Sequence, residues 1–267
     1  MLVGPRLRRN GGERMKSITD SIALSMDCDS IELVPYLPYI LQDFHEVGSH
    51  AESLLRIVNE LKPDRKINVL DLGCGKGAVL CTIAEKIDST CLGIDAIEPF
   101  IQYANKYKNQ RNIKNCDFVV GDIRNLQDIK SSYDFIIMGS IGPIFESYTI
   151  AMESLKNILQ DDGCILLDDG YMENGKKHAV TLEKEELFVQ INKAGMYIER
   201  EYTGKDICLA DEFEGQLDKI KVRCNELIEK YPEGEILFRK YIEKQEVEYS
   251  ALENEITCST MVIRKLA

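Results

Sequence analysis

Three acidic residues stand at or near the ends of three successive apolar runs in the first half of the chain. Asp71 lies in "NVLDL", Asp95 follows "CLGI" and Asp122 follows "FVVG". The stretch "GCGKGA" begins at Gly73, two residues after Asp71. Glycines let a backbone approach a ligand closely, and the first N–H groups of a following helix are free to bind it. Carboxylates bind ammonium groups and accept hydrogen bonds from hydroxyls and amines. These residues predict a site for a small polar molecule.

Two classes of ligand fit the glycine stretch. From Gly73 to Ala78 it satisfies the dinucleotide pattern G-x-G-x-x-G/A, and Asp95 lies at about the expected ~20 residues beyond it. A carboxylate at Asp71 would repel a pyrophosphate, but it can hold the amino-acid ammonium of S-adenosylmethionine, directly or through water. Asp95 can accept both ribose hydroxyls, and Asp122 the adenine amino group. We expect S-adenosylmethionine and keep a nicotinamide dinucleotide as the alternative.

Short apolar runs alternate with amphipathic stretches, which predicts a parallel sheet covered on both faces, a doubly wound α/β fold. The expected strands are 67–72, 90–95, 117–121, 133–139, 164–168, 196–204 and 256–265, and the expected helices are 78–87, 99–108, 148–159 and 184–194. Apolar residues at three- and four-residue steps predict a helical insertion at about 211–250, before the last strand. Residues 15–62 read as a helical cap with two short helices divided near Gly48.

Four motifs, "VLDLGCGKG", "LGIDAIEPFIQYAN", "VVGDI" and "YDFIIMGSIG", resemble in order and spacing those of class I S-adenosylmethionine-dependent methyltransferases, over about residues 67–169. The resemblance implies a seven-stranded Rossmann-like sheet with an antiparallel last strand, within a domain at 63–267. It also implies a set of cofactor-binding residues: Asp71, Gly73, Cys74, Gly75 and Gly77 toward the methionyl end, Asp95 and Ala96 at the ribose, Asp122 and Ile123 at the adenine, and Gly139 and Ser140 near the methyl group.

The sequence limits the possible classes of methyl acceptor mainly by exclusion. "MGSIGP" replaces the Asn/Asp-Pro-Pro-Tyr/Phe motif of relatives that methylate adenine or glutamine amides, and a formal charge of -12 disfavours nucleic acid. Catechol-type relatives hold magnesium between acids after strands four and five, whereas Gly139–Ser140 offers no acid. We therefore expect no metal and a small-molecule acceptor with an O, N or S nucleophile. A non-catalytic S-adenosylmethionine-binding regulator is a further alternative.

A general base is needed only when the nucleophile must lose a proton. Candidates lie at or just beyond the end of the fifth expected strand, and one more lies in the cap: Asp168, Asp169, Tyr171, His178 and His45.

Composition sets the remaining expectations. We find no apolar run of membrane-spanning length and no secretory signal, which predicts a cytoplasmic protein without a membrane partner. Nine scattered cysteines without a CxxC pair argue against zinc or a disulfide framework. Residues 1–14 are basic and lack periodicity, and we expect Met15 to be the true start of a chain whose first segment is a disordered or mis-annotated tail.

Overall fold

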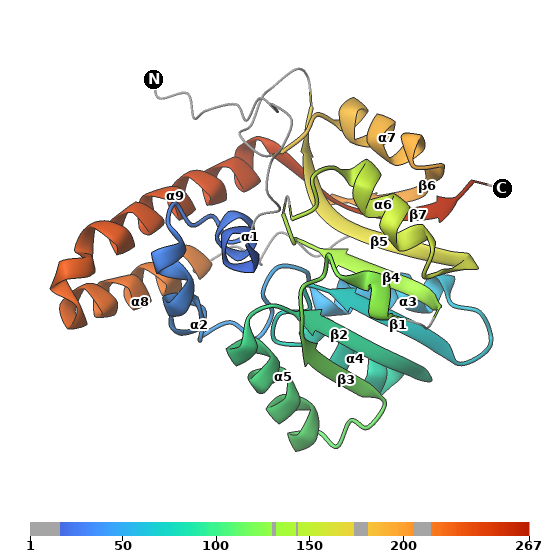
Figure 1. Ribbon diagram of the computed structural model, residues 1–267, viewed down its shortest axis with the longest axis horizontal. Coiled ribbons are helices and arrows are strands. Elements are labelled where there is room, and N and C mark those ends of the chain that lie inside the picture. Colours follow the sequence, from blue (N-terminus) through green and yellow to red (C-terminus); the bar gives the residue numbers. More distant parts are fainter. Residues whose placement is uncertain (1–16, 130–131, 143, 174–180, 205–214, 267) are drawn as a thin grey trace.

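The computed structural model describes residues 17–129, 132–142, 144–173, 181–204 and 215–266 (Figure 1). The predictions for residues 1–14, for Met15 and for His178 fall outside these ranges.

The centre of the fold is a seven-stranded sheet in the order β3-β2-β1-β4-β5-β7-β6. Strand β7 runs antiparallel to both of its neighbours, whereas the pairings among β1 to β5 are parallel. This confirms the predicted fold class and its antiparallel last strand. The strands are β1 Ile67–Leu72, β2 Ser89–Asp95, β3 Cys116–Val120, β4 Tyr133–Gly139, β5 Leu159–Met172, β6 Met196–Thr203 and β7 Ile256–Lys265.

Strand β5 is much longer than the predicted 164–168. At its start Leu159 pairs with Tyr133 of β4, although the charged "QDDG" that follows reads as a loop in sequence. At its end the strand pairs with β7 as far as Met172, opposite Ile256. Long-range pairing with both neighbours therefore extends β5 beyond its own apolar run, and the preceding helix ends earlier than expected, at Lys156.

Helices cover both faces of the sheet. One apolar cluster joins one face to α3 Ala51–Leu61, α4 Ala78–Lys86 and α5 Glu98–Gln110. A second cluster joins the other face to α6 Tyr148–Lys156 and α7 Lys184–Lys193. The short helix η2, Leu126–Asp128, precedes β4.

The remaining helices form a lobe at one end of the sheet, where the blue N-terminal segments lie beside the red α9 (Figure 1). This lobe has its own apolar cluster, built from residues such as Leu37, Phe44, Cys224 and Phe238. The lobe contains α1 Ile18–Ser25, η1 Ile31–Tyr36, α2 Leu37–Ile40, α8 Gln216–Lys230, η4 Pro232–Gly234 and α9 Glu235–Asn254. The predicted cap is therefore divided: its first helices pack on the insertion, while α3 packs on α4 of the sheet layer.

Within the described ranges, no helix combines the length and the apolar character that a membrane span needs.

Candidate functional site

The glycine turn between β1 and α4 adopts a backbone that favours glycine. Gly73, Gly75 and Gly77 have φ angles of +78°, +52° and +79°. A Cβ on Gly73 would lie 2.5 Å from Cγ2 of Ile141, and one on Gly77 would lie 2.5 Å from Cζ of Phe118. Side chains are therefore excluded here by both conformation and space. The N–H groups of Gly73 and Cys74 both donate to the carbonyl of Ile94, at 2.8 and 3.1 Å, which ties the turn to the end of β2.

Asp95, at the end of β2, fixes this turn. Its carboxylate accepts hydrogen bonds from the backbone N–H of Gly75 at 2.9 Å and of Ile97 at 2.8 Å. Burial raises the pKa of Asp95, and these backbone hydrogen bonds oppose the rise. Each carboxylate oxygen retains acceptor capacity for a further donor. Asp95 can therefore hold the turn and still accept hydroxyl groups beside the half-buried Ala96.

Asp71 is a buried carboxyl without a described hydrogen-bond donor. It is 4 % exposed in β1, and burial followed by repulsion from Asp95 raises its pKa to about 8. An isolated buried carboxylate is costly unless a cation compensates it. An ammonium group placed beside the glycine turn would supply that compensation, so this position fits the amino-acid end of S-adenosylmethionine.

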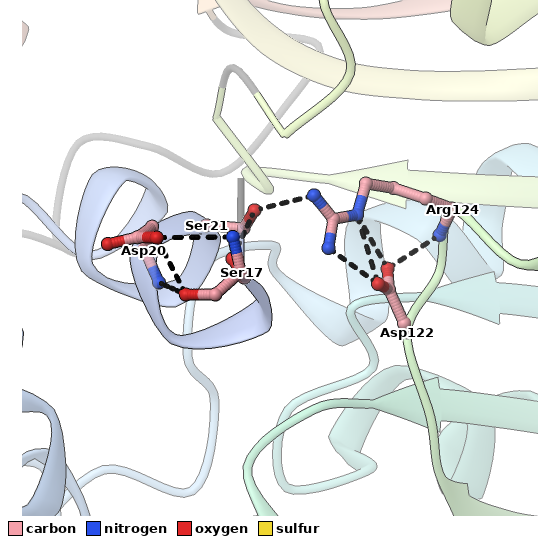
Figure 2. A network of polar contacts seen from close by, with 5 residues as sticks. All are labelled: Ser17, Asp20, Ser21, Asp122 and Arg124. Atoms are coloured by element: carbon pink, nitrogen blue, oxygen red, sulfur yellow. Dashed lines mark hydrogen bonds and ion pairs between the residues drawn. The ribbon is translucent and has the colours of Figure 1, made fainter. Parts of the chain in front are cut away.

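Asp122 follows β3 and lies in a polar network with the N-terminal lobe (Figure 2). Arg124 donates to it from Nε at 2.8 Å and from Nη2 at 2.6 Å, and also from its backbone N–H at 3.0 Å. This guanidinium lowers the pKa of Asp122. Arg124 Nη1 also donates to Ser21 Oγ at 2.9 Å, which connects the candidate adenine end of the site to α1.

The start of α1 is well defined chemically. Ser17 and Asp20 form a capping box, in which the side chain of each residue accepts from the backbone N–H of the other (Figure 2). Such a cap satisfies two N–H groups that the first helical turn leaves open. It fixes α1 where Ser21 meets Arg124.

The other predicted cofactor residues surround the same sheet edge. Ile123 is 4 % exposed and packs in the cluster that includes Met138. Ser140 has a φ of +50° and donates its backbone N–H to the carbonyl of Asp168 at 2.8 Å. Cys74 is buried, and burial raises the pKa of its thiol well above the usual value, so it is an inert lining residue.

The two aspartates of β5 have different environments. Asp168 Oδ1 accepts from Thr260 at 2.6 Å, while Asp169 Oδ2 accepts from the Tyr148 hydroxyl at 2.5 Å. Burial raises the pKa of both carboxyls. Because side chains alternate along a strand, the two residues point to opposite faces of the sheet.

Tyr171 shares its face of β5 with Asp169 but bonds other residues, and His45 lies against α5. The Tyr171 hydroxyl donates to Glu201 at 2.6 Å and accepts from Lys184 at 2.9 Å, on the α7 side of the sheet. The His45 ring lies 4.2 Å from that of Tyr107 in α5, and burial lowers its pKa. The surroundings of Tyr171 therefore account for its hydroxyl without an acceptor, whereas the buried Nδ1 of His45 has no hydrogen-bond partner among the described residues.

Three residues at the site were not among the sequence candidates. Lys76 lies inside the glycine turn, and its 4 % exposed side chain donates to the carbonyls of Leu41 and Phe44, each at 2.6 Å. Arg124 holds Asp122, and Ser49 lies against Gly139. The glycine motif places Lys76 at the site, but nothing in the sequence indicates that it bonds the cap, and Ser49 lies in no recognisable motif.

Metal ligation has no support among the described residues, which contain no group of three or more His, Cys, Asp or Glu placed to hold an ion.

Comparisons with known proteins identify the family. Residues 63–228 match the family described as "methyltransferase domain", and the chain belongs to this family. An uncharacterized RNA methyltransferase of Clostridium tetani is 26% identical over 185 residues, which cover 59% of this chain and 40% of that protein. Aklanonic acid methyltransferase of Streptomyces is 37% identical over 92 residues, covering 34% and 41%. The chain thus spans less than half the length of these two relatives.

A solved structure of a methyltransferase from Geobacter sulfurreducens, in complex with S-adenosyl-L-homocysteine, has the same fold. Its TM-score is 0.71 at 16% identity, with 86% of this chain and 98% of that chain covered.

Proposed function

We propose that this protein is an S-adenosylmethionine-dependent methyltransferase that acts on a small-molecule acceptor. The observation that carries the proposal is a row of three acids around a glycine turn: Asp71 in β1, Asp95 at the end of the adjacent β2, and Asp122 just after β3. S-adenosylmethionine carries an ammonium, a ribose diol and an exocyclic adenine amine, and three carboxylates can bind these groups. The pyrophosphate of a nicotinamide dinucleotide would be repelled by them. Membership of the methyltransferase domain family supports the same cofactor.

Each residue has a distinct task in this proposal. Asp71 binds the amino group at the methionyl end, and Asp95 accepts the ribose hydroxyls while holding the Gly75 N–H. Asp122 accepts from the adenine amino group and is oriented by Arg124. When bound, S-adenosylmethionine supplies an electrophilic methyl group on a positively charged sulfur. The protein has to align the acceptor with that methyl, and alignment alone can contribute up to ~7–11 kcal/mol.

A small-molecule acceptor is favoured over RNA. The aklanonic acid methyltransferase relative supports it by name, as does the formal charge of -12, which opposes binding to a phosphate backbone. The name of the Clostridium tetani relative makes RNA the second candidate.

We place the protein in the cytoplasm, because the eight cysteines in the described ranges are free thiols, as is usual in a reducing compartment.

Methyl-labelled S-adenosylmethionine tests the proposal with two acceptor pools, a metabolite extract and total RNA. We expect S-adenosylhomocysteine to form and the label to appear in the metabolite fraction. Label in RNA alone would overturn the small-molecule acceptor. Tight cofactor binding without turnover in either pool would instead identify a non-catalytic regulator.

A further inference from the structure

Residues 45–50, here called the strap, cross the carboxyl edge of the sheet between the helical lobe and α3. His45 stacks near Tyr107 of α5. Val47 follows, with its Cβ 3.6 Å from where a Cβ on Gly75 would lie, and a Cβ on Gly48 would lie 3.0 Å from that of Ser140. The strap therefore passes from α5 over the glycine turn to the end of β4.

Both ends of the strap are anchored. On one side the Lys76 ammonium bonds the carbonyls of Leu41 and Phe44. On the other side His50 caps α3, where its Nδ1 accepts from the backbone N–H of Ser53 at 3.3 Å. Ser49 thus lies between two fixed points, and its side chain has a defined position above the sheet edge.

Ser49 carries a buried hydroxyl that lacks a hydrogen-bond partner of normal geometry. The residue is only 7 % exposed. Its Oγ occupies the space where a Cβ on Gly139 would lie, so the absence of a side chain at Gly139 is what admits it. A buried hydroxyl without a well-aligned partner costs free energy, which is repaid when a ligand supplies a hydrogen bond of normal geometry.

Asp168 lies beside this hydroxyl. Burial raises the pKa of Asp168, and the adjacent Ser49 hydroxyl, the hydrogen bond from Thr260 and the nearby His50 each oppose this rise. Thr260 donates to Oδ1 of this carboxylate, and within the described ranges no donor with normal geometry reaches Oδ2. The Ser49 hydroxyl and the Asp168 carboxylate thus offer one donor and one acceptor next to Gly139 and Ser140, the residues expected near the methyl group.

The geometry points to Ser49 as a residue that binds the methyl acceptor together with Asp168, and to an acceptor whose nucleophilic atom carries a hydrogen, either a hydroxyl or an amine. This inference rests on the proposed methyltransferase function. The X–H group donates to Asp168. A hydroxyl oxygen also accepts from Ser49 and keeps its second lone pair for the methyl carbon, whereas an amine donates a second N–H to Ser49 Oγ and keeps its single lone pair for the methyl carbon.

The reaction balances with these groups. X forms a bond to the methyl carbon as the carbon–sulfur bond breaks, and the electron pair of that bond stays on the sulfur, which becomes a neutral thioether. The proton of X–H passes to the Asp168 carboxylate and then to solvent. A carboxylate acceptor fits poorly, because it has no proton to donate and would be repelled by the neighbouring Asp168.

The test uses the full chain with S-adenosylmethionine and a panel of alcohols, phenols, amines and carboxylic acids built on shared carbon skeletons. We expect S-adenosylhomocysteine to form with hydroxyl or amine compounds and not with the matched carboxylic acids. Assaying the alcohols and phenols separately from the amines shows which of the two groups is methylated. With the best acceptor, Ser49→Ala should raise KM by about 10–100-fold, the loss of one strong hydrogen bond. Cofactor affinity should stay within about twofold of the wild type.

Two further variants separate binding from structure. Ser89→Ala removes another buried hydroxyl, at the far end of β2, where it donates to the carbonyl of Ile87, and should leave KM unchanged. Asp168→Asn should lower kcat by about 10²–10⁴-fold and flatten the acidic limb of the pH profile. Calorimetric titration of the acceptor into the S-adenosylhomocysteine complex should show the loss of acceptor affinity in Ser49→Ala in the absence of turnover.

The inference is overturned if only carboxylic acids are methylated, if no hydroxyl or amine compound in the panel is methylated by protein that binds S-adenosylmethionine, or if Ser49→Ala leaves KM unchanged. A protein that fails to bind S-adenosylmethionine would overturn the proposed function itself.

Discussion

Among single residues, Asp71 connects stability and function most directly. Its carboxyl is fully enclosed near a second acid, Asp95, and its pKa of about 8 lies far above the ordinary 3.8. The folded protein therefore binds a proton that the unfolded chain releases between about pH 4 and pH 8. Stability from this group is present at low pH and falls as the pH rises across that window. A bound ammonium would stabilise the charged form.

Asp71→Asn should remove this pH dependence. At pH 8 we expect the variant to be more stable than the wild type by about 1–3 kcal/mol, with the difference shrinking toward pH 5. Its affinity for S-adenosylmethionine should fall by at least about tenfold, since a neutral amide does not compensate an ammonium. Urea unfolding at both pH values and calorimetry measure the two effects. Equal pH dependence in the two proteins would contradict the assignment.

Asp95→Ala should impair both the turn and the ligand. Loss of the ribose contacts predicts binding of S-adenosylmethionine weaker by about 1.5–3 kcal/mol, and the Gly75 and Ile97 N–H groups also lose their acceptor. Asp117→Ala removes an exposed acid of β3 that pairs with Lys108, and serves as the matched control. Unchanged affinity in Asp95→Ala would remove this residue from the ribose site.

The sequence predicts the position of some of these residues at the site but not of others, and the difference has a physical cause. Asp71, Asp95 and Asp122 could be placed together because parallel strands present their carboxyl ends at one edge, so the motif order fixes the neighbours. Ser49 and Arg124 act through contacts between segments distant in the chain, with Gly139 and Ser21. No local pattern records such an approach. The ligand roles of the predicted residues stay predictions until binding is measured.

At the scale of elements, the glycine turn and the cap are joined by one buried lysine. Lys76 extends from the turn to two carbonyls at the end of the α2 segment, beneath the rings of Phe100 and Tyr103. Burial lowers its pKa to about 8. The helical lobe is therefore attached at the point where the methionyl end of the cofactor is expected, so the strap and the turn form one unit.

Lys76→Met should loosen the attachment of the strap to the glycine turn. Two buried carbonyls lose their donor, which predicts a loss of about 1–3 kcal/mol in the free energy of unfolding. Lys86→Met is the control, because Lys86 pairs with Glu52 at the surface and such pairs contribute at most about 1 kcal/mol. Limited proteolysis should cut the strap faster in the Lys76 variant alone. Similar effects of both substitutions would show that the buried bonds do not hold the cap.

Strand β5 shows where local pattern is insufficient. Its central apolar run identifies the strand, but its ends are set by pairing with β4 and β7, and these carry it to Met172. The extension matters for function, because Asp168 and Asp169 lie within a paired strand rather than in a loop after it. Their side chains consequently face opposite sides of the sheet, and only Asp168 lies beside the strap.

In the whole molecule, the helical lobe lies against one edge of the Rossmann-like sheet (Figure 1). The lobe unites the first helices of the chain with α8 and α9 around a common apolar cluster. It reaches the sheet edge through Arg124 and Ser21 at one point, and through Lys76 at another. We propose that this arrangement encloses the acceptor and excludes water from the reacting atoms.

The central claim is that the sheet edge binds a sulfonium amino acid rather than a dinucleotide. Isothermal titration calorimetry of the purified chain with S-adenosylmethionine and, separately, with NAD tests it most directly. We expect one-to-one binding of S-adenosylmethionine, competition by S-adenosylhomocysteine and no heat of binding for NAD. Binding of NAD without binding of S-adenosylmethionine would contradict it.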